Sequence, residues 1–197
     1  RVMKSVTSWL ERKLRLKVSA TKTKVVRPTK STFLGFTFWK GTDGWKTRPA
    51  NDRKAKLYDK TREILCRRKA VARPLSVSFV KLNQLMRGWI NYFGIGSMKG
   101  FMQEYGAWMR HKVRVVILKQ WKKPKTIYKN LQKLNRIGKC RFTDEDIFKV
   151  ANSRLGWYRR CGMDVVNYAL SPKILGLKTK DRPGLVDPLA YYLARCT

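Results

Sequence analysis

Apolar residues between Ser78 and Trp121 recur at steps of three and four, which is the spacing of helices that bury one face. The first stripe comprises Phe79, Leu82, Met86, Trp89 and Phe93, and the second comprises Met98, Phe101, Met102, Tyr105, Met109, Val113 and Val116. Gly94 and Gly96 lie between the stripes, and glycine ends helices readily because it adopts left-handed backbone angles without strain. The pattern therefore predicts two antiparallel helices joined by a short turn.

The aromatic residues of this helical pair are expected mainly in its core. They include Trp89, Phe93, Tyr105 and Trp108. A rival interpretation places them on the surface, where aromatic rings can stack on nucleic-acid bases.

Before residue 50, the spacing of apolar residues changes from that of a helix to that of strands. Residues 1–15 keep helical spacing, whereas 16–26 suit two short strands around a polar turn. The strongest strand pattern covers 32–39, and a glycine-containing turn leads from it into a second strand at 45–48. Gly35 interrupts the aromatic residues of 32–39, and a glycine inside a strand can mark the close approach of another backbone.

Further helices are predicted on both sides of the central pair. Residues 52–72 form a basic helix with a narrow apolar line, and 125–134 form a shorter one. Thr143 followed by three acids at 144–146 is typical of a helix N-terminus. After residue 156, recurring glycine and proline indicate short helices and loops. The elements together predict an α+β fold, a small antiparallel β section followed by a mainly helical bundle.

The charge of the chain is strongly one-sided, with 46 Lys and Arg against 12 Asp and Glu, a net charge of +34. A folded body with this charge repels itself unless a polyanion compensates, so RNA, DNA and anionic membrane are the candidate partners. No apolar run approaches the roughly 20 residues that span a bilayer, so a membrane partner is not expected. Aromatic residues make up 12% of the chain and are interleaved with basic ones, which favours nucleic acid.

Basic residues on the polar faces of the predicted helices are therefore the candidate nucleic-acid contacts. They are Arg53, Lys56, Lys60, Arg67, Arg68, Arg87, Arg110, Arg114, Lys119, Lys122, Lys123 and Lys125. Within the central pair, Arg87, Arg110, Arg114 and Lys119 are expected to face the RNA.

The sequence contains no motif typical of an independent catalytic or metal site. The four cysteines are widely spaced and the chain has one histidine, which excludes the common zinc spacings and favours reduced thiols in a cytoplasmic protein. Asp144 and Asp146 could pair as ligands of a two-metal site, but their position after Thr143 is far more typical of a helix cap. No glycine-rich phosphate loop or nucleophile triad is present, so we expect no metal site in this segment.

Four sequence blocks in order resemble one family of RNA-binding enzymes. They are Leu16-Lys17-Val18 with Lys22-Thr23-Lys24-Val25-Val26, Phe33-Leu34-Gly35-Phe36, Arg87-Gly88-Trp89-Ile90-Asn91-Tyr92-Phe93, and Lys119-Gln120-Trp121-Lys122-Lys123-Pro124. Over roughly residues 1–160, their order and spacing resemble the C-terminal half of a bacterial group II intron reverse transcriptase/maturase. Four blocks in register are far more specific than any one of them.

The resemblance implies a domain organisation. Residues 1–48 would end the reverse transcriptase palm, 49–74 would be a basic connecting helix, and 75–155 would be the thumb or maturase helical domain. Residues 156–197 would be a C-terminal basic segment and a candidate DNA-binding extension.

The resemblance also implies roles and partners. Lys22 would lie near the incoming nucleotide and is the one candidate catalytic residue. Phe33, Leu34, Gly35 and Phe36 would support the primer end. The implied partners are group II intron RNA and the template–primer duplex, with target DNA as a further candidate. The implied function is support of RNA splicing and of RNA-templated DNA synthesis in retrohoming.

The sequence also departs from the family pattern. The aspartates that bind Mg²⁺ in the family would precede Arg1, so the full-length enzyme is expected to use Mg²⁺ through residues outside this segment, and residues 1–197 alone should not polymerise. Ser19 and Thr21 replace the asparagine and glutamate that usually precede the lysine. Two alternatives stay open, a non-catalytic RNA-binding splicing cofactor and a DNA-binding protein, although the second lacks helix-turn-helix spacing and a zinc module.

Overall fold

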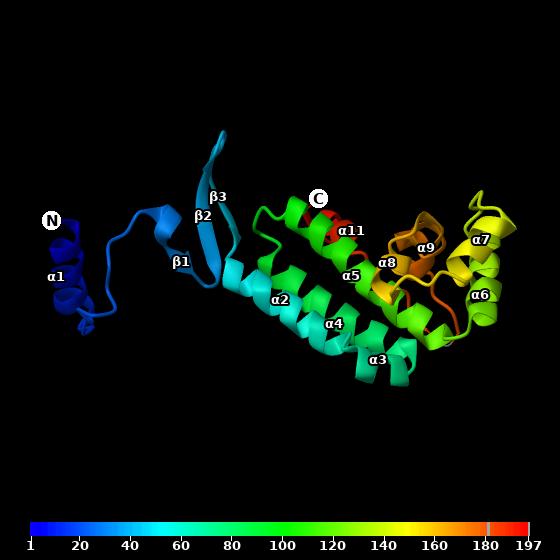
Figure 1. Cartoon of the computed structure of the whole chain (residues 1–197). Coiled ribbons are helices and arrows are strands. Elements are labelled where there is room, and N and C mark those ends of the chain that lie inside the picture. The colour runs from blue at the N-terminus through cyan, green and yellow to red at the C-terminus, as the bar shows by residue number, and fades with distance from the viewer. Residues whose placement is uncertain (181, 197) are drawn as a thin grey trace. The chain divides into compact units, whose positions relative to one another are not determined.

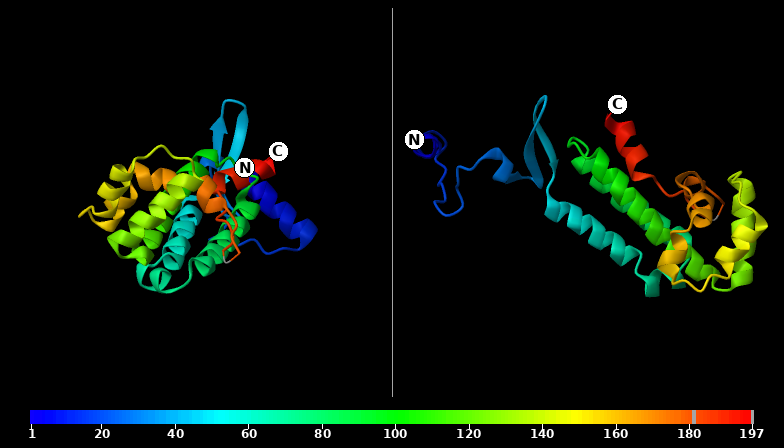
Figure 2. Two further views of the ribbon diagram at one scale, coloured as in Figure 1. Left: turned by 90° about the vertical axis from the view of Figure 1, so that its right-hand side faces the viewer. Right: turned by 45° about the horizontal axis from the view of Figure 1, so that its top comes forward.

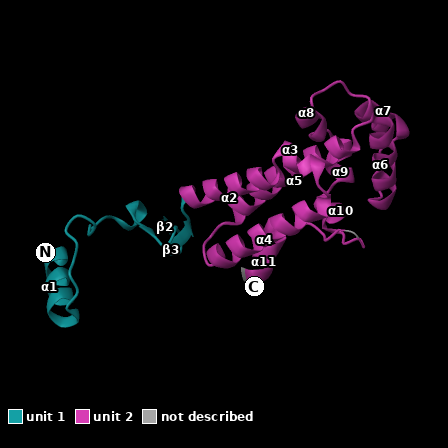
Figure 3. Ribbon diagram, turned by 90° about the horizontal axis from the view of Figure 1, so that it is seen from below, with its two compact units in different colours: residues 1–50 teal, residues 51–197 magenta. Residues whose placement is uncertain are grey.

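The chain forms two compact units, residues 1–50 and residues 51–197 (Figure 3). The computed structural model describes residues 1–180 and 182–196. The first unit contains a small antiparallel sheet and the second is helical, which confirms the predicted α+β class. The finer division of the chain at residues 74 and 155 stays a prediction.

The first unit contains one long helix and a three-stranded sheet in the order β1-β2-β3 (Figure 1). Its elements are α1 (Val2–Leu14), a 3-10 turn η1 (Pro28–Lys30), β1 (Thr32–Phe33), β2 (Phe36–Gly41) and β3 (Gly44–Pro49). All neighbours are antiparallel, and Phe38 of β2 pairs with Thr47 of β3. The initial helix and the hairpin ending near residue 48 are therefore confirmed.

The segment predicted as one strand, 32–39, is instead split by a tight turn at Leu34 and Gly35. Their φ angles are 50° and 82°, the left-handed values that two-residue hairpin turns require. Gly35 thus serves the turn, and its carbonyl oxygen accepts a hydrogen bond from the Ala50 amide at 2.8 Å. The backbone that approaches Gly35 closely is therefore that of Ala50, directly after the end of β3.

The two strands predicted within residues 16–26 are wrong. This segment contains a turn closed by the Thr23 amide and the Ser19 carbonyl at 2.9 Å, but no strand. Leu16, Val25 and Val26 are exposed, and none of them pairs with the sheet of this unit. A hairpin without a third strand or a helix to cover its apolar face is marginal in water, so the alternating pattern alone does not produce one.

The regular elements described in the second unit are helices, beside one isolated β-bridge between Thr179 and Arg182. The helices are α2 (Asn51–Ile64), α3 (Arg67–Ala72), α4 (Leu75–Phe93), α5 (Lys99–Trp121), α6 (Pro124–Ile137), α7 (Asp144–Ala151), α8 (Trp157–Cys161), α9 (Asp164–Ala169), α10 (Pro172–Gly176) and α11 (Pro188–Cys196). Helices α4 and α5 run in opposite directions and are joined by a short turn (Figure 1). The predicted helical pair is confirmed, as are the shorter helices that follow it.

The apolar stripes of α4 and α5 form the centre of the hydrophobic core. Phe79 and Leu82 of α4 and Met109 and Val113 of α5 are completely buried. Tyr105 is also buried, and its hydroxyl shares a 2.7 Å hydrogen bond with the Thr61 hydroxyl of α2. Truncating one large buried side chain of this kind typically costs about 2–5 kcal/mol. The predicted packing is confirmed for Phe93 and Tyr105, which are buried, whereas Trp89 and Trp108 are half-buried at the edge of the core.

The basic helix predicted at 52–72 is two helices, because α2 ends at Ile64 and α3 begins at Arg67. The guanidinium of Arg73 donates hydrogen bonds to the Ile64 carbonyl and to the Ser78 hydroxyl. An arginine from beyond the break therefore satisfies the last carbonyl of α2, as helix C-termini require. Leu65, between the helices, is buried in the core.

The predicted cap at Thr143 is confirmed. The Thr143 hydroxyl accepts a hydrogen bond from the Asp146 amide at 3.2 Å, and the Asp146 carboxylate accepts one from the Thr143 amide at 3.1 Å. The Thr143 hydroxyl also donates to the Asp146 carboxylate at 2.8 Å, and this bond, followed by the bond from the Thr143 amide, lowers the pKa of Asp146. Asp144 instead accepts a hydrogen bond from Gln132 of α6 at 3.0 Å. Asp146 thus caps α7, and Asp144 ties the start of α7 to α6.

The C-terminal segment folds back onto the central pair, and α11 packs against α4 and α5 (Figure 2). Asn83 of α4 donates to the Gly184 carbonyl at 2.8 Å and accepts from the Val186 amide at 2.9 Å. Arg110 of α5 forms a 2.6 Å ion pair with Asp187. Residues 184–196 are thus fastened to the helical bundle by buried and half-buried polar contacts.

Candidate nucleic-acid interface

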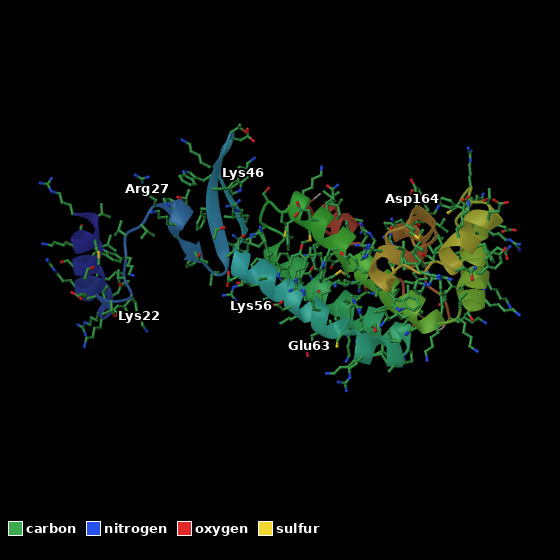
Figure 4. The ribbon with its side chains drawn as sticks, in the orientation of Figure 1. Lys22, Arg27, Lys46, Lys56, Glu63 and Asp164 are labelled. Atoms are coloured by element: carbon green, nitrogen blue, oxygen red, sulfur yellow. The ribbon has the colours of Figure 1, made fainter. Side chains whose placement is uncertain are left out.

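Most of the predicted basic contacts lie on the surface, as the side chains drawn in Figure 4 illustrate for Lys56 of α2. The exposed ones are Arg53, Lys56, Lys60, Arg67, Arg68, Arg87, Lys122, Lys123 and Lys125. Arg110 and Lys119 are half-buried. Only some of these residues come together in space, so exposure alone does not define a site.

Four of the predicted residues converge at one open hollow, which we call the basic hollow. Arg67 and Arg68 come from α3, and Lys119 and Lys122 come from the end of α5. The hollow has a volume of about 680 Å³ and is completed by Val71, Ala72, Gln120 and Trp157. No carboxylate lines it, and none of the four cations is in an ion pair with any residue that the structure describes. The charge of the basic hollow is therefore available to an anion.

Gln120 fixes the two walls of the basic hollow relative to each other. Its side-chain amide donates to the carbonyls of Ala70, Val71 and Arg73 at 3.3, 3.5 and 2.9 Å. These carbonyls lie at the C-terminal end of α3, where backbone acceptors lack helical partners. The contact ties α5 to α3, so the cations on the two helices keep a fixed spacing.

A second hollow, of about 380 Å³, lies where α2, α3 and α4 meet. Lys60 is the one predicted contact there, and it is joined by Lys69, Arg73 and Lys81. Glu63 also lines this hollow, so its charge is partly balanced. Sequence reasoning did not select Lys69, Arg73 or Lys81 because their convergence depends on the break between α2 and α3.

A group of cations and rings also crosses α2, α5 and α8. The Arg62 guanidinium lies 5.6 Å from the ring centre of Trp108, and the Lys112 ammonium lies 5.8 Å from it. Lys112 is also 5.7 Å from the ring of Tyr158. At these distances the rings attract the cations directly, so this surface is held together by its own contacts. His111, beside Tyr158, has its pKa lowered by burial and by Arg114, and it is neutral at pH 7.

The predicted RNA-facing position of Arg114 is wrong. Arg114 is 8% exposed, and its guanidinium donates to the Leu170 carbonyl at 3.1 and 3.2 Å and to the Asn167 carbonyl at 3.2 Å. Burial, and secondarily the charge of Arg110, lowers its pKa to about 10, so it stays charged at pH 7. Arg114 holds the end of α9 against α5. Helical periodicity missed this because α9 lies more than 50 residues away in the chain.

Arg110 is also tied to the protein, through its ion pair with Asp187, and its side chain is 18% exposed. Its prediction as an RNA contact stays a prediction, but the Asp187 carboxylate already balances its charge. Of the four residues predicted to face RNA from the central pair, Arg87 is exposed and Lys119 lines the basic hollow. Arg87 does not line the basic hollow.

The candidate residues of the first unit lie on its loop and hairpin. Lys22 is exposed in the irregular segment after α1 (Figure 4). Phe33 and Leu34 are each 66% exposed at the first hairpin turn, whereas Gly35 and Phe36 are buried. The hairpin therefore offers an apolar tip on a fixed base. The roles in nucleotide binding and primer support stay predictions.

Over residues 1–180 and 182–196, no three His, Cys, Asp or Glu side chains come together as a metal site. Cys66, Cys140 and Cys161 are free thiols, and burial raises the pKa of Cys161 to about 12. Among the described helices, none is long and apolar enough to cross a membrane.

Most residues that line the basic hollow lie in a part of the chain that matches a known protein-family model. Residues 54–135, from α2 to α6, match the model of the group II intron, maturase-specific domain. Over this range the chain is similar to group II intron maturase-specific domains. The match implies a maturase role in group II intron splicing and an interaction with intron RNA. A comparison with curated proteins finds no match.

The maturase-specific domain confirms the resemblance that the sequence blocks indicated. Arg67, Arg68, Lys119, Gln120 and Lys122 lie inside the matched range, whereas Trp157 of the same hollow lies outside it. The basic hollow is thus made largely by residues that match the maturase-specific model and is completed by Trp157 of α8.

Proposed function

We propose that the maturase domain binds group II intron RNA through the basic hollow and thereby supports folding and splicing of the intron. The observation that carries this proposal is the convergence of four unpaired cations from α3 and α5 in one hollow without a carboxylate. Phosphate contacts by arginine and lysine supply most of the affinity of RNA-binding proteins at moderate salt. The contact between Gln120 and α3 keeps these charges in place before RNA arrives.

Within a whole protein, we propose that this chain also helps to grip a template–primer duplex during RNA-templated DNA synthesis and retrohoming. The support is the order of the four family-like blocks and the exposed apolar tip at Phe33 and Leu34. Among the described residues, no three His, Cys, Asp or Glu side chains come together to hold a Mg²⁺ ion. Target DNA is proposed as a further partner on the strength of the net charge of +34.

The experiment replaces the charges of the basic hollow and measures binding of a group II intron RNA. The hollow variant carries Arg67→Gln, Arg68→Gln, Lys119→Gln and Lys122→Gln. The control variant carries Lys129→Gln, Lys133→Gln, Arg136→Gln and Lys173→Gln, four exposed positions with the same charge change.

We expect the hollow variant to lose RNA affinity and splicing support by at least tenfold more than the control at physiological salt, because its cations act on the same segment of RNA. Thermal melts check that both variants fold. Equal losses of affinity in the two variants would mean that RNA responds to the total charge of the protein and not to the cations of one site. The proposal would then fail. A duplex DNA of the same length tests the DNA-binding alternative, which predicts that DNA binds at least as tightly as the intron RNA.

A further inference from the structure

Trp157 gives the basic hollow a chemistry that phosphate binding alone does not need. It is the one aromatic residue lining this hollow, and the other lining groups are four cations, Gln120 and two small apolar residues. Trp157 begins α8, far along the chain from Arg67 and Arg68. The fold therefore brings an indole ring and four cations together from three separate helices.

The indole ring of Trp157 is held in a defined position. The Arg160 guanidinium lies 5.4 Å from the centre of this ring. Arg160 is itself buried, and it donates hydrogen bonds to the Val150 carbonyl, at 2.7 Å, and to the Ala151 carbonyl. Trp157 also packs against the hydrophobic core while remaining half-exposed. A ring supported in this way can receive a planar group without first being ordered, which lowers the entropic cost of binding.

The size of the hollow fits a ligand larger than a phosphate. Its volume of about 680 Å³ lies within the range of about 300–1,000 Å³ found for sites that hold small organic molecules. A regular RNA duplex keeps its bases stacked inside and offers phosphates and ribose hydroxyls. An unpaired nucleotide offers both a phosphate and an exposed base face, and aromatic side chains stack on such bases.

We propose that the basic hollow binds an unpaired ribonucleotide of the intron RNA, with its base stacked on Trp157 and its phosphates held by Arg67, Arg68, Lys119 and Lys122. This inference rests on the proposed function and names the part of the RNA that the hollow recognises. The charge pairing gives affinity and the ring selects single-stranded or bulged segments over a continuous duplex. Recognition of this kind is tolerant of sequence, because every base has a face that can stack.

The test compares Trp157→Leu with Trp157→Phe, using a single-stranded oligoribonucleotide and an RNA duplex of equal length. Trp157→Leu should weaken single-strand binding by about 5- to 150-fold, the equivalent of about 1–3 kcal/mol for one stacked base. Duplex binding and the salt slope should stay as in the parent, because no cation is removed. Trp157→Phe should restore much of the single-strand affinity. Trp45→Leu is the matched control, since Trp45 is an exposed tryptophan of the first unit.

The outcomes separate this inference from the proposed function. If Trp157→Leu binds the single strand like the parent while the hollow variant does not, the hollow takes phosphates only and the stacking proposal is overturned. If the hollow variant also binds like the parent, both proposals fail. Equal losses of duplex and single-strand binding in Trp157→Leu would likewise overturn the selection of unpaired bases.

A measurement on the unaltered chain covers the case in which Trp157→Leu does not fold. A single-stranded RNA carrying 4-thiouridine is cross-linked by light to the 197-residue protein, and the cross-linked peptide is identified by mass spectrometry. We expect the cross-link at Trp157 or a residue beside it in the hollow. Cross-links confined to other surfaces would contradict the proposal.

Discussion

At the scale of single residues, some arginines line the basic hollow and others are used inside the protein. Arg67 and Arg68 were predicted as RNA contacts and do line the basic hollow. Arg114 fits the same helical pattern but is used inside the protein, where three backbone carbonyl contacts replace water around its guanidinium. Helical periodicity shows which residues point away from the apolar core of their own helix pair. It does not show that a segment distant in the chain can pack over such a residue and accept its hydrogen bonds.

Replacing Arg114 with methionine should therefore destabilise the fold. The Leu170 and Asn167 carbonyls would remain buried without their donor, and the expected cost is about 3 kcal/mol, since each unsatisfied buried group costs about 1–3 kcal/mol. Urea denaturation measures the change. Arg87→Met on the exposed face of α4 is the control, and we expect it within about 0.5 kcal/mol of the parent. An Arg114→Met variant as stable as the parent would contradict the internal role.

Tyr105 gives a prediction about pH. Burial raises the pKa of its phenol to about 12, above the usual value of 10. As pH rises, the phenol of Tyr105 therefore loses its proton in the unfolded chain before it does so in the folded chain. Between pH 10 and 12 the folded state binds more protons than the unfolded state, so the stability that Tyr105 contributes falls across this window. The shift corresponds to about 2–3 kcal/mol.

The measurement is the free energy of unfolding of the parent and of Tyr105→Phe from pH 9 to 12. Arg114 and Cys161 also titrate in this range, so the difference between the two proteins isolates the Tyr105 contribution. We expect the parent to lose stability relative to Tyr105→Phe as pH rises. A difference that stays constant with pH would contradict the assigned burial of the phenol.

At the scale of elements, local rules predicted those features that local contacts determine. The long helices follow from apolar spacing, and the start of α7 follows from Thr143 and Asp146. The strands expected within 16–26 did not form, because a strand needs a partner and periodicity does not supply one. The break after Ile64 was missed because it depends on Arg73, nine residues later. The same break creates the second hollow and separates α3 from α2.

The two hydrogen bonds of the Asn83 side chain hold the C-terminal segment, residues 184–196, to α4. We therefore expect one substitution at Asn83 to loosen this segment. Asn83 is 9% exposed and both ends of its amide are used by Gly184 and Val186. Asn83→Ala should destabilise the unit by about 2 kcal/mol, because the half-buried Gly184 carbonyl and Val186 amide lose their partner. Amide hydrogen exchange in α11 should accelerate more than in α4. The neighbouring residue Gln84 is exposed, so Gln84→Ala should leave both quantities unchanged. Faster exchange in both variants would show that the Asn83 hydrogen bonds do not specifically hold α11.

At the scale of the whole molecule, the net charge of +34 indicated a nucleic-acid partner but not a location for it. Location depends on which cations are already balanced inside the protein, as Arg110 is by Asp187. It also depends on which helices meet, and α3, α5 and α8 meet at Gln120 and Trp157. Of these, Lys119, Gln120 and Lys122 belong to one of the four sequence blocks, whereas Trp157 falls in the segment after residue 156, for which the sequence predicts short helices and loops. The basic hollow is therefore a tertiary feature whose parts, but not their assembly, could be predicted.

The central claim is that intron RNA is bound by the four cations of the basic hollow. The most direct test is the slope of log affinity against log salt concentration for the parent, the hollow variant and the control variant defined above. Each lost phosphate contact flattens the slope by about 0.7–0.9. We expect the hollow variant to be flatter than the parent by about 3, and the control variant by less than about 1. A hollow variant with the parent's slope, or a control variant that flattens it equally, would contradict the account.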